Sequence, residues 1–354
     1  MRRRRAAAEH LLVLALGLLV LVVHDVPYLL RVPFWADEAW VAVTTRFPLA
    51  QLPATTSSTP IGFSVLVRLV TVTGQQTGRL LPLAFAAAAV PVAYWLARRL
   101  DWPWPPASVI AGLLAAVAVL LVPAMLARDD LKQYTADAFL SLLVLALTAR
   151  LEADWSRWRL AALSVTAGAG MLLSDAVAFT AIAAFTAVCL VQVGRRCWRR
   201  LAQALAAGGG AAVLMLGVYE AFDARAVSPG LTAFWAGFYL PARRGIGASL
   251  AFVMGRFDFA HAYFGLGPAW LAIPLVISGL VTLAWTRRPA TALAAAALWP
   301  ELLALSALHR YPFLDIRTST FLFTITAVVA AVGVAGLGAL ARAALSRSGA
   351  ARFA

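Results

Sequence analysis

Two adjacent carboxylates near the start of the chain have the chemistry of an acid or a base. Asp37 and Glu38 follow Pro33 and lie among aromatic residues, Phe34 and Trp40. A proline favours a helix start just after it, and acidic residues in a first turn suit the helix dipole. The pair is either a stabiliser of a helix at the membrane surface or a general base whose pKa is tuned by apolar neighbours. Spacing alone does not separate these two interpretations.

A charged turn at 127–137 supplies cations of the kind that bind phosphate. If the turn is helical, Arg128 and Lys132 stack one turn apart, and both residue types bind a phosphate well. A second row of polar side chains lies beside them: Asp130, Tyr134 and Asp137. For the turn taken alone, internal pairing of the cations with the neighbouring acids is the slightly favoured alternative.

Two further segments carry charged or aromatic side chains. A turn at 309–317 holds Tyr311 and Arg317, an arginine that is as readily a snorkelling anchor as a ligand. The aromatic segment 234–239 favours a place in the membrane interface, with a platform for a sugar or lipid as the alternative. The sequence contains no P-loop, dinucleotide-binding fingerprint, serine-nucleophile motif or metal-ligand spacing of histidines.

The elements that must position these residues are membrane spans. Of 354 residues, 62% are hydrophobic and 13% are charged, whereas a soluble domain is nearer half apolar and a quarter charged. Because a span needs about 20 mostly apolar residues, the length predicts roughly eight to eleven of them. The expected fold class is therefore an all-α polytopic membrane protein.

The hydrophobic runs predict about ten transmembrane helices in a single domain that covers residues 1–354. A short apolar stretch at 61–73 is interrupted by Arg68, which favours an interfacial helix within the first external loop. No soluble domain is expected. The expected spans are 9–26, 79–100, 107–126, 136–151, 160–173, 177–193, 201–222, 268–285, 290–308 and 318–341. The external segments are 27–78, 127–137, 223–267 and 309–317.

The net charge of +14 is a signal of topology. With ten spans both termini lie on one side, and that side carries 18 basic and four acidic residues, whereas the remainder carries 12 of each. The positive-inside rule then predicts cytoplasmic termini and places the candidate segments outside. Nucleic acid is not an expected partner, because topology accounts for the basic excess.

Several short motifs occur in the order found in the GT-C superfamily of membrane glycosyltransferases, so the chain resembles that superfamily. The most similar branch holds the protein O-mannosyltransferases, the lipid A aminoarabinose transferase and bacterial relatives. One departure is Thr59, which stands where the family has a histidine before the proline. Another is the soluble domain after the last span, which many members carry and which is not expected here. The motifs are Asp37-Glu38, Ser58–Phe63, Arg79–Pro82, Ala97–Leu100, Asp130–Tyr134, Tyr311–Phe313 and Arg317.

The resemblance implies transfer of a sugar from a polyprenyl-phosphate donor, by direct displacement with inversion, at the outer face of a bacterial cytoplasmic membrane. Asp37 is the implied base, and Glu38 supports it or orients the acceptor. Lys132 is the implied partner of the donor phosphate, with Arg128 and Arg317 as helpers. Further donor or acceptor contacts are implied for Asp130, Tyr134, Asp137 and Tyr311.

The same resemblance sets the expected cofactors and partners. Some members of the superfamily use a divalent cation, and two adjacent carboxylates permit Mg²⁺ or Mn²⁺ without requiring it. Expected partners are the lipid-linked sugar donor, membrane lipids and a glycan, lipid or protein acceptor in the cell envelope. The alternative is a transporter or flippase of a lipid-linked or polar substrate, which predicts charged residues at mid-membrane depth, as Glu301 would be. The enzyme interpretation requires Asp37 and Lys132 to face one external cavity.

Overall fold

The computed structural model describes residues 2–55, 59–74, 76–127, 130–225 and 229–350, and all regular elements within these ranges are helices. The long helices are α1 Arg2–Leu18, α7 Leu80–Arg98, α8 Pro105–Leu121, α10 Tyr134–Ala153, α11 Arg157–Gly170, α12 Ala176–Gly194, α13 Trp198–Ala221, α15 Ile246–Phe264, α16 Ala269–Trp285, α17 Pro289–Ala307 and α18 Thr320–Ala350. The short helices are α2 Val20–Val23, α3 Val26–Leu29, α4 Ala36–Thr44, α5 Leu52–Thr55, α6 Ile61–Val70, α9 Pro123–Leu126 and α14 Pro229–Phe234.

The ten hydrophobic segments are helical, so the all-α membrane fold class is confirmed. Six helices are long and apolar enough to cross a membrane, and α15 and α16 add a seventh crossing if they are counted as one bent span. Within the described ranges, the apolar part of α1 and α2, α10 and α11 do not meet that standard of length and composition. At 14 residues, α11 extends about 21 Å, which is less than a hydrocarbon core of about 30 Å.

Helix α15 is the largest difference from the sequence-based expectation, which placed a long loop at 223–267. Its 19 residues include charged side chains near the middle, and these made the segment resemble a loop. One of them, Arg256, is satisfied by tertiary contacts, because its guanidinium donates to the carbonyl oxygens of Phe313 and Leu314 and lies over Phe238. The helix ends at Gly265, whose φ of +67° suits glycine, and α16 then leaves at 75° to it.

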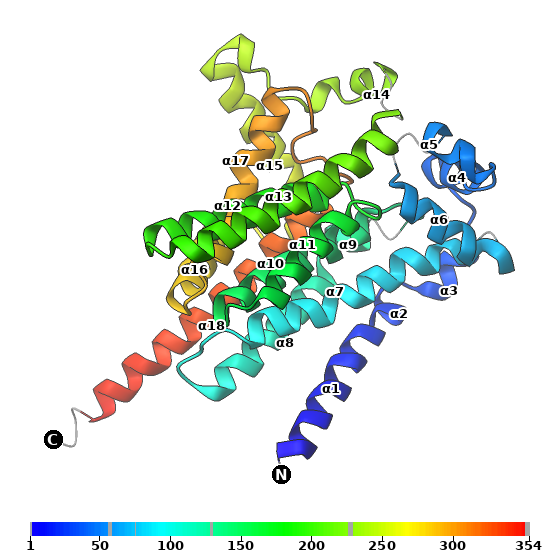
Figure 1. Ribbon diagram of the computed structural model, residues 1–354. Helices are drawn as coiled ribbons and strands as arrows, with labels where there is room; N and C mark the ends of the chain where they lie inside the picture. Colours follow the sequence, from blue (N-terminus) through cyan, green and yellow to red (C-terminus); the bar gives the residue numbers. More distant parts are fainter. Residues whose placement is uncertain (1, 56–58, 75, 128–129, 226–228, 351–354) are drawn as a thin grey trace.

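The bundle has two distinct ends. Both chain termini lie at one end, and the short helices α4, α5, α6 and α14 gather at the other (Figure 1). Helix α18 forms the centre of the bundle, with 83% of its most apolar stretch buried inside the protein, and it packs against α8, α10 and α16. The short helix α4 carries the candidate residues Asp37 and Glu38. The candidate site therefore lies at this end of the bundle, where the long helices end.

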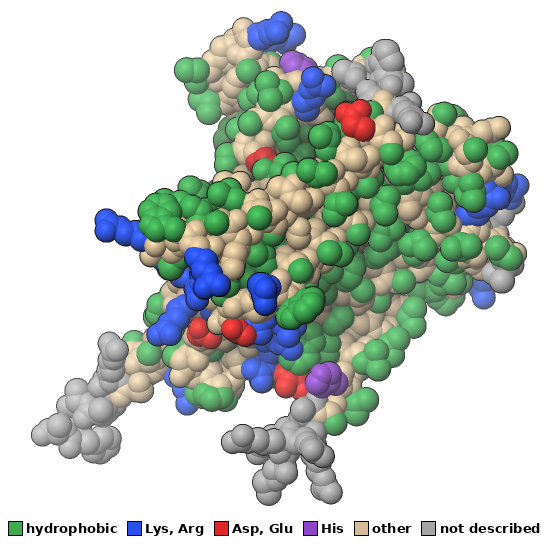
Figure 2. Space-filling model, in the orientation of Figure 1, with side chains coloured by type: hydrophobic (Ala, Val, Ile, Leu, Met, Phe, Trp, Pro, Cys, Tyr) green, Lys and Arg blue, Asp and Glu red, His purple; other side chains and the backbone are tan. Residues whose placement is uncertain are grey.

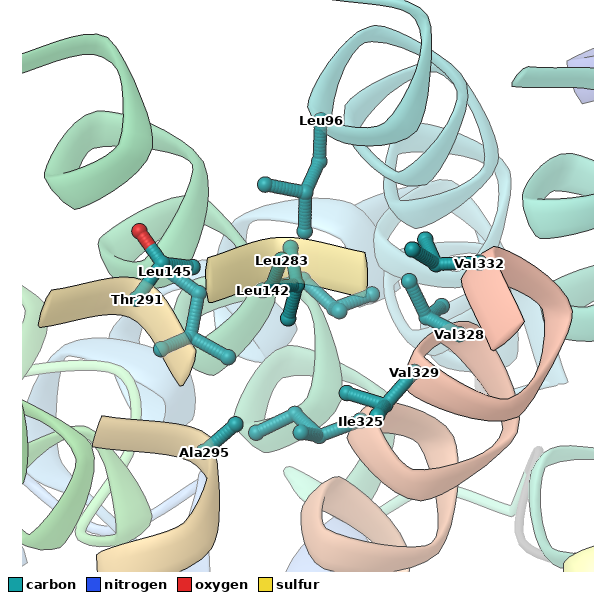
Figure 3. Close-up of a pocket in the computed structure, with 10 residues that line it drawn as sticks. All are labelled: Leu96, Leu142, Leu145, Leu283, Thr291, Ala295, Ile325, Val328, Val329 and Val332. Atoms are coloured by element: carbon teal, nitrogen blue, oxygen red, sulfur yellow. The ribbon is translucent and has the colours of Figure 1, made fainter. Parts of the chain in front are cut away.

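A very small cavity lies in the middle of the bundle. Where α7, α10, α16, α17 and α18 meet, apolar side chains converge on a cavity of about 10 Å³ (Figure 3), close to the smallest space that holds one water molecule. Its lining residues are Leu96, Leu142, Leu145, Leu283, Thr291, Ala295, Ile325, Val328, Val329 and Val332.

Helices α16 and α18 approach so closely that glycine is needed at their contact. A Cβ atom at Gly279 would lie 1.9 Å from the carbonyl oxygen of Val329, and one at Gly333 would lie 2.3 Å from the carbonyl oxygen of Leu275. Because the obstructing atoms belong to the backbone, only a separation of the two helices can make room. Small residues serve the same purpose in other membrane helix pairs.

We expect Gly279→Ala to lower the free energy of unfolding by about 1–3 kcal/mol or more, the range usual for overpacking. Thermal unfolding in detergent measures the effect. Gly209→Ala in α13 is the matched control, because a Cβ atom there meets no other atom within 4 Å. Equal unfolding midpoints for the two variants would contradict the close approach of α16 and α18.

Candidate active site

A buried ion pair fixes the second carboxylate of the acidic doublet. The side chains of Glu38 and Arg79 are 1% and 3% exposed. Nε of Arg79 donates to Oε1 of Glu38 at 2.7 Å, and a shorter bond joins its Nη2 to Oε2. The backbone N–H groups of Leu131 and Trp35 also donate to this carboxylate, at 2.9 Å and 3.2 Å. Glu38 therefore links α4 to the start of α7 and to the turn before α10.

The remaining donors of Arg79 close the segment that precedes α4. Its Nη1 donates to the carbonyl oxygens of Leu29 and Val32, and its Nη2 donates to that of Pro33. The guanidinium also lies 4.8 Å from the centroid of the Phe34 ring. Sequence analysis gave Arg79 no role beyond its motif, because no local pattern identifies a partner 41 positions away.

Asp37, one residue earlier on α4, makes a different contact. Its Oδ2 atom lies 3.3 Å from Nη1 of Arg317, a residue 280 positions later in the chain. The Asp37 side chain is 38% exposed and that of Arg317 is 18% exposed, so the pair is accessible from solvent. The guanidinium of Arg317 lies 4.8 Å from the centroid of the Trp235 ring, which brings the aromatic segment 234–239 into the site.

The turn that carries Arg317 is held by its own hydrogen bonds. Asp315, which is buried, accepts from the backbone N–H of Arg317 at 3.0 Å. Leu314 has a positive φ of 51°, a conformation that costs a branched residue about 1–2 kcal/mol. Arg256 offsets this cost, because its Nη2 donates to the carbonyl oxygen of Leu314 at 2.6 Å.

Lys132 lies buried beside the Asp37–Arg317 pair. Lys132 is only 4% exposed. Burial lowers the pKa of its ammonium group, whereas the charges of Asp37 and Asp130 raise this pKa. Tyr134 is buried too and lies within electrostatic reach of Asp130, Arg317 and Asp37. Six of the predicted residues therefore lie together at one end of the bundle: Asp37, Glu38, Asp130, Lys132, Tyr134 and Arg317.

The other two described candidates, Asp137 and Tyr311, form a neighbouring group. Asp137 is buried and lies close to Ser174 and Ala176, at the start of α12. The hydroxyl of Tyr311 donates to the carbonyl oxygen of Thr318 at 2.6 Å. Burial, with the nearby charge of Asp137, raises the pKa of Tyr311. This group packs behind the turn that carries Arg317.

Arg128, predicted to help bind phosphate, lies outside the described residues. Within the described part of the chain, no three or more histidine, cysteine, aspartate or glutamate side chains lie together as a metal site would require. The arrangement is therefore a mixed-charge cluster in which one accessible carboxylate stands beside two cations.

Two further acids, Asp175 and Asp223, lie near Asp137. Burial raises the pKa of Asp223, in the short turn Asp223–Arg225, to about 6. Burial, together with the charges of Asp223 and Asp137, raises the pKa of Asp175. A carboxyl group with a raised pKa is less costly to the folded state when it is protonated.

We expect Arg79→Gln to lower the free energy of unfolding by about 3–5 kcal/mol, because it leaves the buried Glu38 carboxylate without its partner. Unfolding in detergent measures the loss. Arg68→Gln is the control, since that side chain donates a single hydrogen bond, to the carbonyl oxygen of Phe47, and should cost about 1 kcal/mol. Similar losses for both variants would mean that the ion pair does not organise this region.

We expect the stability of the protein to fall as the pH rises from about 4 to about 6, through ionisation of Asp223. Its pKa in the folded protein, about 6, exceeds the ordinary value of 3.8, so the folded state binds the proton more tightly and loses this stabilisation on ionisation. Asp223→Asn should flatten this part of the pH profile of the unfolding midpoint. Asp258→Asn, at an exposed position, should keep the wild-type profile. A wild-type profile for Asp223→Asn would refute the assignment.

Comparison with known proteins gives matches in structure alone. No protein-family model matches the chain, and no curated protein matches its sequence. The crystal structure of ArnT from Cupriavidus metallidurans in the apo state is 19% identical, with a TM-score of 0.52 over 94% of this chain and 60% of that chain. The archaeal oligosaccharyltransferase AglB from Archaeoglobus fulgidus, in complex with an inhibitory peptide and a dolichol-phosphate, is 15% identical, with a TM-score of 0.49 over 92% of this chain and 50% of that chain.

The likeness to ArnT extends over nearly the whole of this chain, which spans 60% of the length of the ArnT chain. It covers the helices that carry the charged cluster as well as those that form the core. The protein therefore shares its fold with ArnT, which agrees with the resemblance of its ordered motifs.

Proposed function

We propose that the protein is a glycosyltransferase that moves a sugar from a polyprenyl-phosphate donor to a glycan, lipid or protein acceptor of the cell envelope. The observation that carries the proposal is the convergence of Asp37, Lys132 and Arg317 at one end of a GT-C bundle. A carboxylate beside two cations matches a reaction in which a proton is removed while an anionic leaving group forms.

In the proposed step, the acceptor oxygen bonds to the anomeric carbon as the bond from that carbon to the phosphate oxygen breaks. The electron pair of the broken bond leaves with the polyprenyl phosphate, whose negative charge rises by one. The acceptor proton passes to Asp37 and then to water. Attack opposite the phosphate inverts the anomeric centre. Positioning and charge stabilisation supply most of the acceleration in such a reaction.

The cations have separate tasks in this proposal. Lys132 stabilises the charge that develops on the leaving phosphate, with Arg128 and Arg317 as helpers. Arg317 also lies 3.3 Å from Oδ2 of Asp37, so it helps to hold this carboxylate in position. Asp130 and Tyr134 are close enough to Lys132 to contact the donor in the same place.

The remaining candidates act through their neighbours. Glu38 is a positioning residue for Asp37, because its carboxylate is held by Arg79 and by two backbone N–H groups. Tyr311 donates within the turn that carries Arg317, so it positions that arginine. Asp137 supports the start of α12, behind the same turn. No step in this proposal requires a divalent cation.

The site faces the outside of the cytoplasmic membrane in this proposal. The end of the bundle that carries both termini also carries the basic turns, which the positive-inside rule assigns to the cytoplasm. The opposite end, with Asp37, presents large apolar side chains outward: Trp40, Val43 and Leu69 are 56%, 55% and 64% exposed. Such side chains suit a surface that meets lipid and the polyprenyl tail of a donor.

We expect Asp37→Asn to lower the transfer of labelled sugar from cell-derived polyprenyl phosphate-sugars by about 10²–10⁴-fold, because the amide cannot accept the acceptor proton. Donor binding, measured separately, should be kept. Lys132→Met should instead weaken donor binding. Asp258→Asn removes an exposed carboxylate on α15 and is the control for the loss of one negative charge.

Two outcomes would contradict the proposal. Full turnover by Asp37→Asn would remove this residue from the role of base. If the wild type transfers no sugar from any donor but moves a lipid-linked carrier across the membrane of vesicles, the protein is a flippase and the assignment to a transferase is wrong.

A further inference from the structure

A second, much larger cavity lies at the end of the bundle opposite Asp37. Its volume is about 540 Å³, and it opens between the C-terminal ends of α7 and α10, beside the start of α11. Four arginines and one aspartate line it: Arg99, Arg150, Arg159, Arg288 and Asp154. The space is large enough for a small ligand or a lipid headgroup.

Two of the four arginines are already paired. Arg288 is buried and lies 3.2 Å from Asp101, and Arg159 lies 2.6 Å from Asp154. The charges of these two arginines are therefore balanced by carboxylates of the protein, without a ligand. The two ion pairs leave the charges of the other two arginines to be explained.

Arg99 and Arg150 have no such acceptor within the described part of the chain. The side chain of Arg99 makes a cation–π contact instead, in which its guanidinium lies 4.8 Å from the centroid of the Trp95 ring. Burial and the like charges of Arg150 and Arg159 lower the pKa of Arg99, whereas the charge of Glu9 raises it. Arg99 and Arg150 are exposed residues at the mouth of the cavity, so an anion can reach both guanidinium groups.

The deeper wall of the cavity is apolar. It is formed by Val92 on α7 and by Leu143, Ala146 and Leu147 on α10. These side chains are partly buried, so the cavity keeps an apolar surface open below its ring of arginines. An anionic head with an apolar tail matches both parts of this lining, whereas a free inorganic anion matches only one.

This feature goes beyond the proposed function. About 20 residues of α7 separate Arg79 from Arg99, which places the two ends about 30 Å apart. The positive-inside rule explains why basic residues collect at the end of the bundle with the termini, where Figure 2 shows a group of Arg side chains on one face. It does not explain why arginines without an acidic partner surround a cavity with an apolar wall.

We propose that this cavity binds the phosphate group of a membrane lipid from the leaflet on the side of the termini. Arg99 and Arg150 hold the phosphate, and the apolar chain lies along Leu143 and Leu147 of α10. Arginine suits this task, because its planar fork donates two hydrogen bonds to one phosphate. The negative charge of the lipid phosphate balances the positive charges of the arginines at the adjoining ends of α7, α10 and α11.

The test is native mass spectrometry of the full chain in detergent, titrated with phosphatidylglycerol and with a diacylglycerol of the same chains. The wild type should retain one phosphatidylglycerol, and the Arg99→Gln/Arg150→Gln variant should bind it about tenfold more weakly or worse, because it lacks the charged hydrogen-bond donors to the phosphate. The diacylglycerol, which has no phosphate, should bind as weakly to both proteins.

Two matched variants keep the result interpretable. Arg157→Gln/Arg199→Gln removes the same charge from exposed positions outside the cavity and should bind the lipid as the wild type does. Ala146→Phe keeps every charge but fills the apolar wall, and it should also lose the lipid. Thermal unfolding of each variant checks that it is folded.

Three outcomes would overturn the proposal. Equal lipid binding by Arg99→Gln/Arg150→Gln and the wild type would remove the arginines from the site. Unchanged lipid binding by Ala146→Phe would show that the phosphate binds at the surface and not in the cavity. Displacement of the lipid by equimolar sn-glycerol 3-phosphate would show that the site takes a soluble phosphate ester, so the assignment to a lipid would be wrong.

Discussion

The buried pair of Glu38 and Arg79 is the interaction on which the active end of this protein depends. Two charges removed from water need each other and a full set of hydrogen bonds, and removal of either partner is costly. Here the pair also forms hydrogen bonds with five backbone groups, those of Leu29, Val32, Pro33, Trp35 and Leu131. The first loop, α4, the start of α7 and the turn before α10 therefore hold their positions together.

This constraint also decides where Asp37 points. Neighbouring residues on a helix project about 100° apart, so a helix that buries Glu38 at one position must turn Asp37 toward another surface. That surface holds Arg317 and Lys132, which arrive from two other parts of the chain. An adjacent pair of acids thus divides into one that is buried by the fold and one that remains accessible from solvent.

The sequence predicted the helical class and the candidate residues better than their partners. Long apolar runs indicate helices, because the backbone of a membrane span must form its hydrogen bonds within the span. All ten predicted segments are helical. The apolar pattern did not predict α15, because this helix contains the charged Arg256. The guanidinium of Arg256 donates hydrogen bonds to carbonyl oxygens of a turn that is distant in the sequence. The Asp37–Arg317 contact and the role of Arg79 were also not predicted, since pairs separated by 280 and 41 residues leave no local pattern.

Helices α7 and α10 connect both charged regions, and the membrane explains their design. Each has 19 or 20 residues, which gives a length of about 30 Å, the thickness of a hydrocarbon core. Polar groups are tolerated at their ends because water and headgroups begin there, whereas the shared middle is sealed around a cavity of about 10 Å³. A helix that must cross this distance carries charges at both boundaries, so the two ends can serve different ligands while the packed core keeps them at a fixed separation.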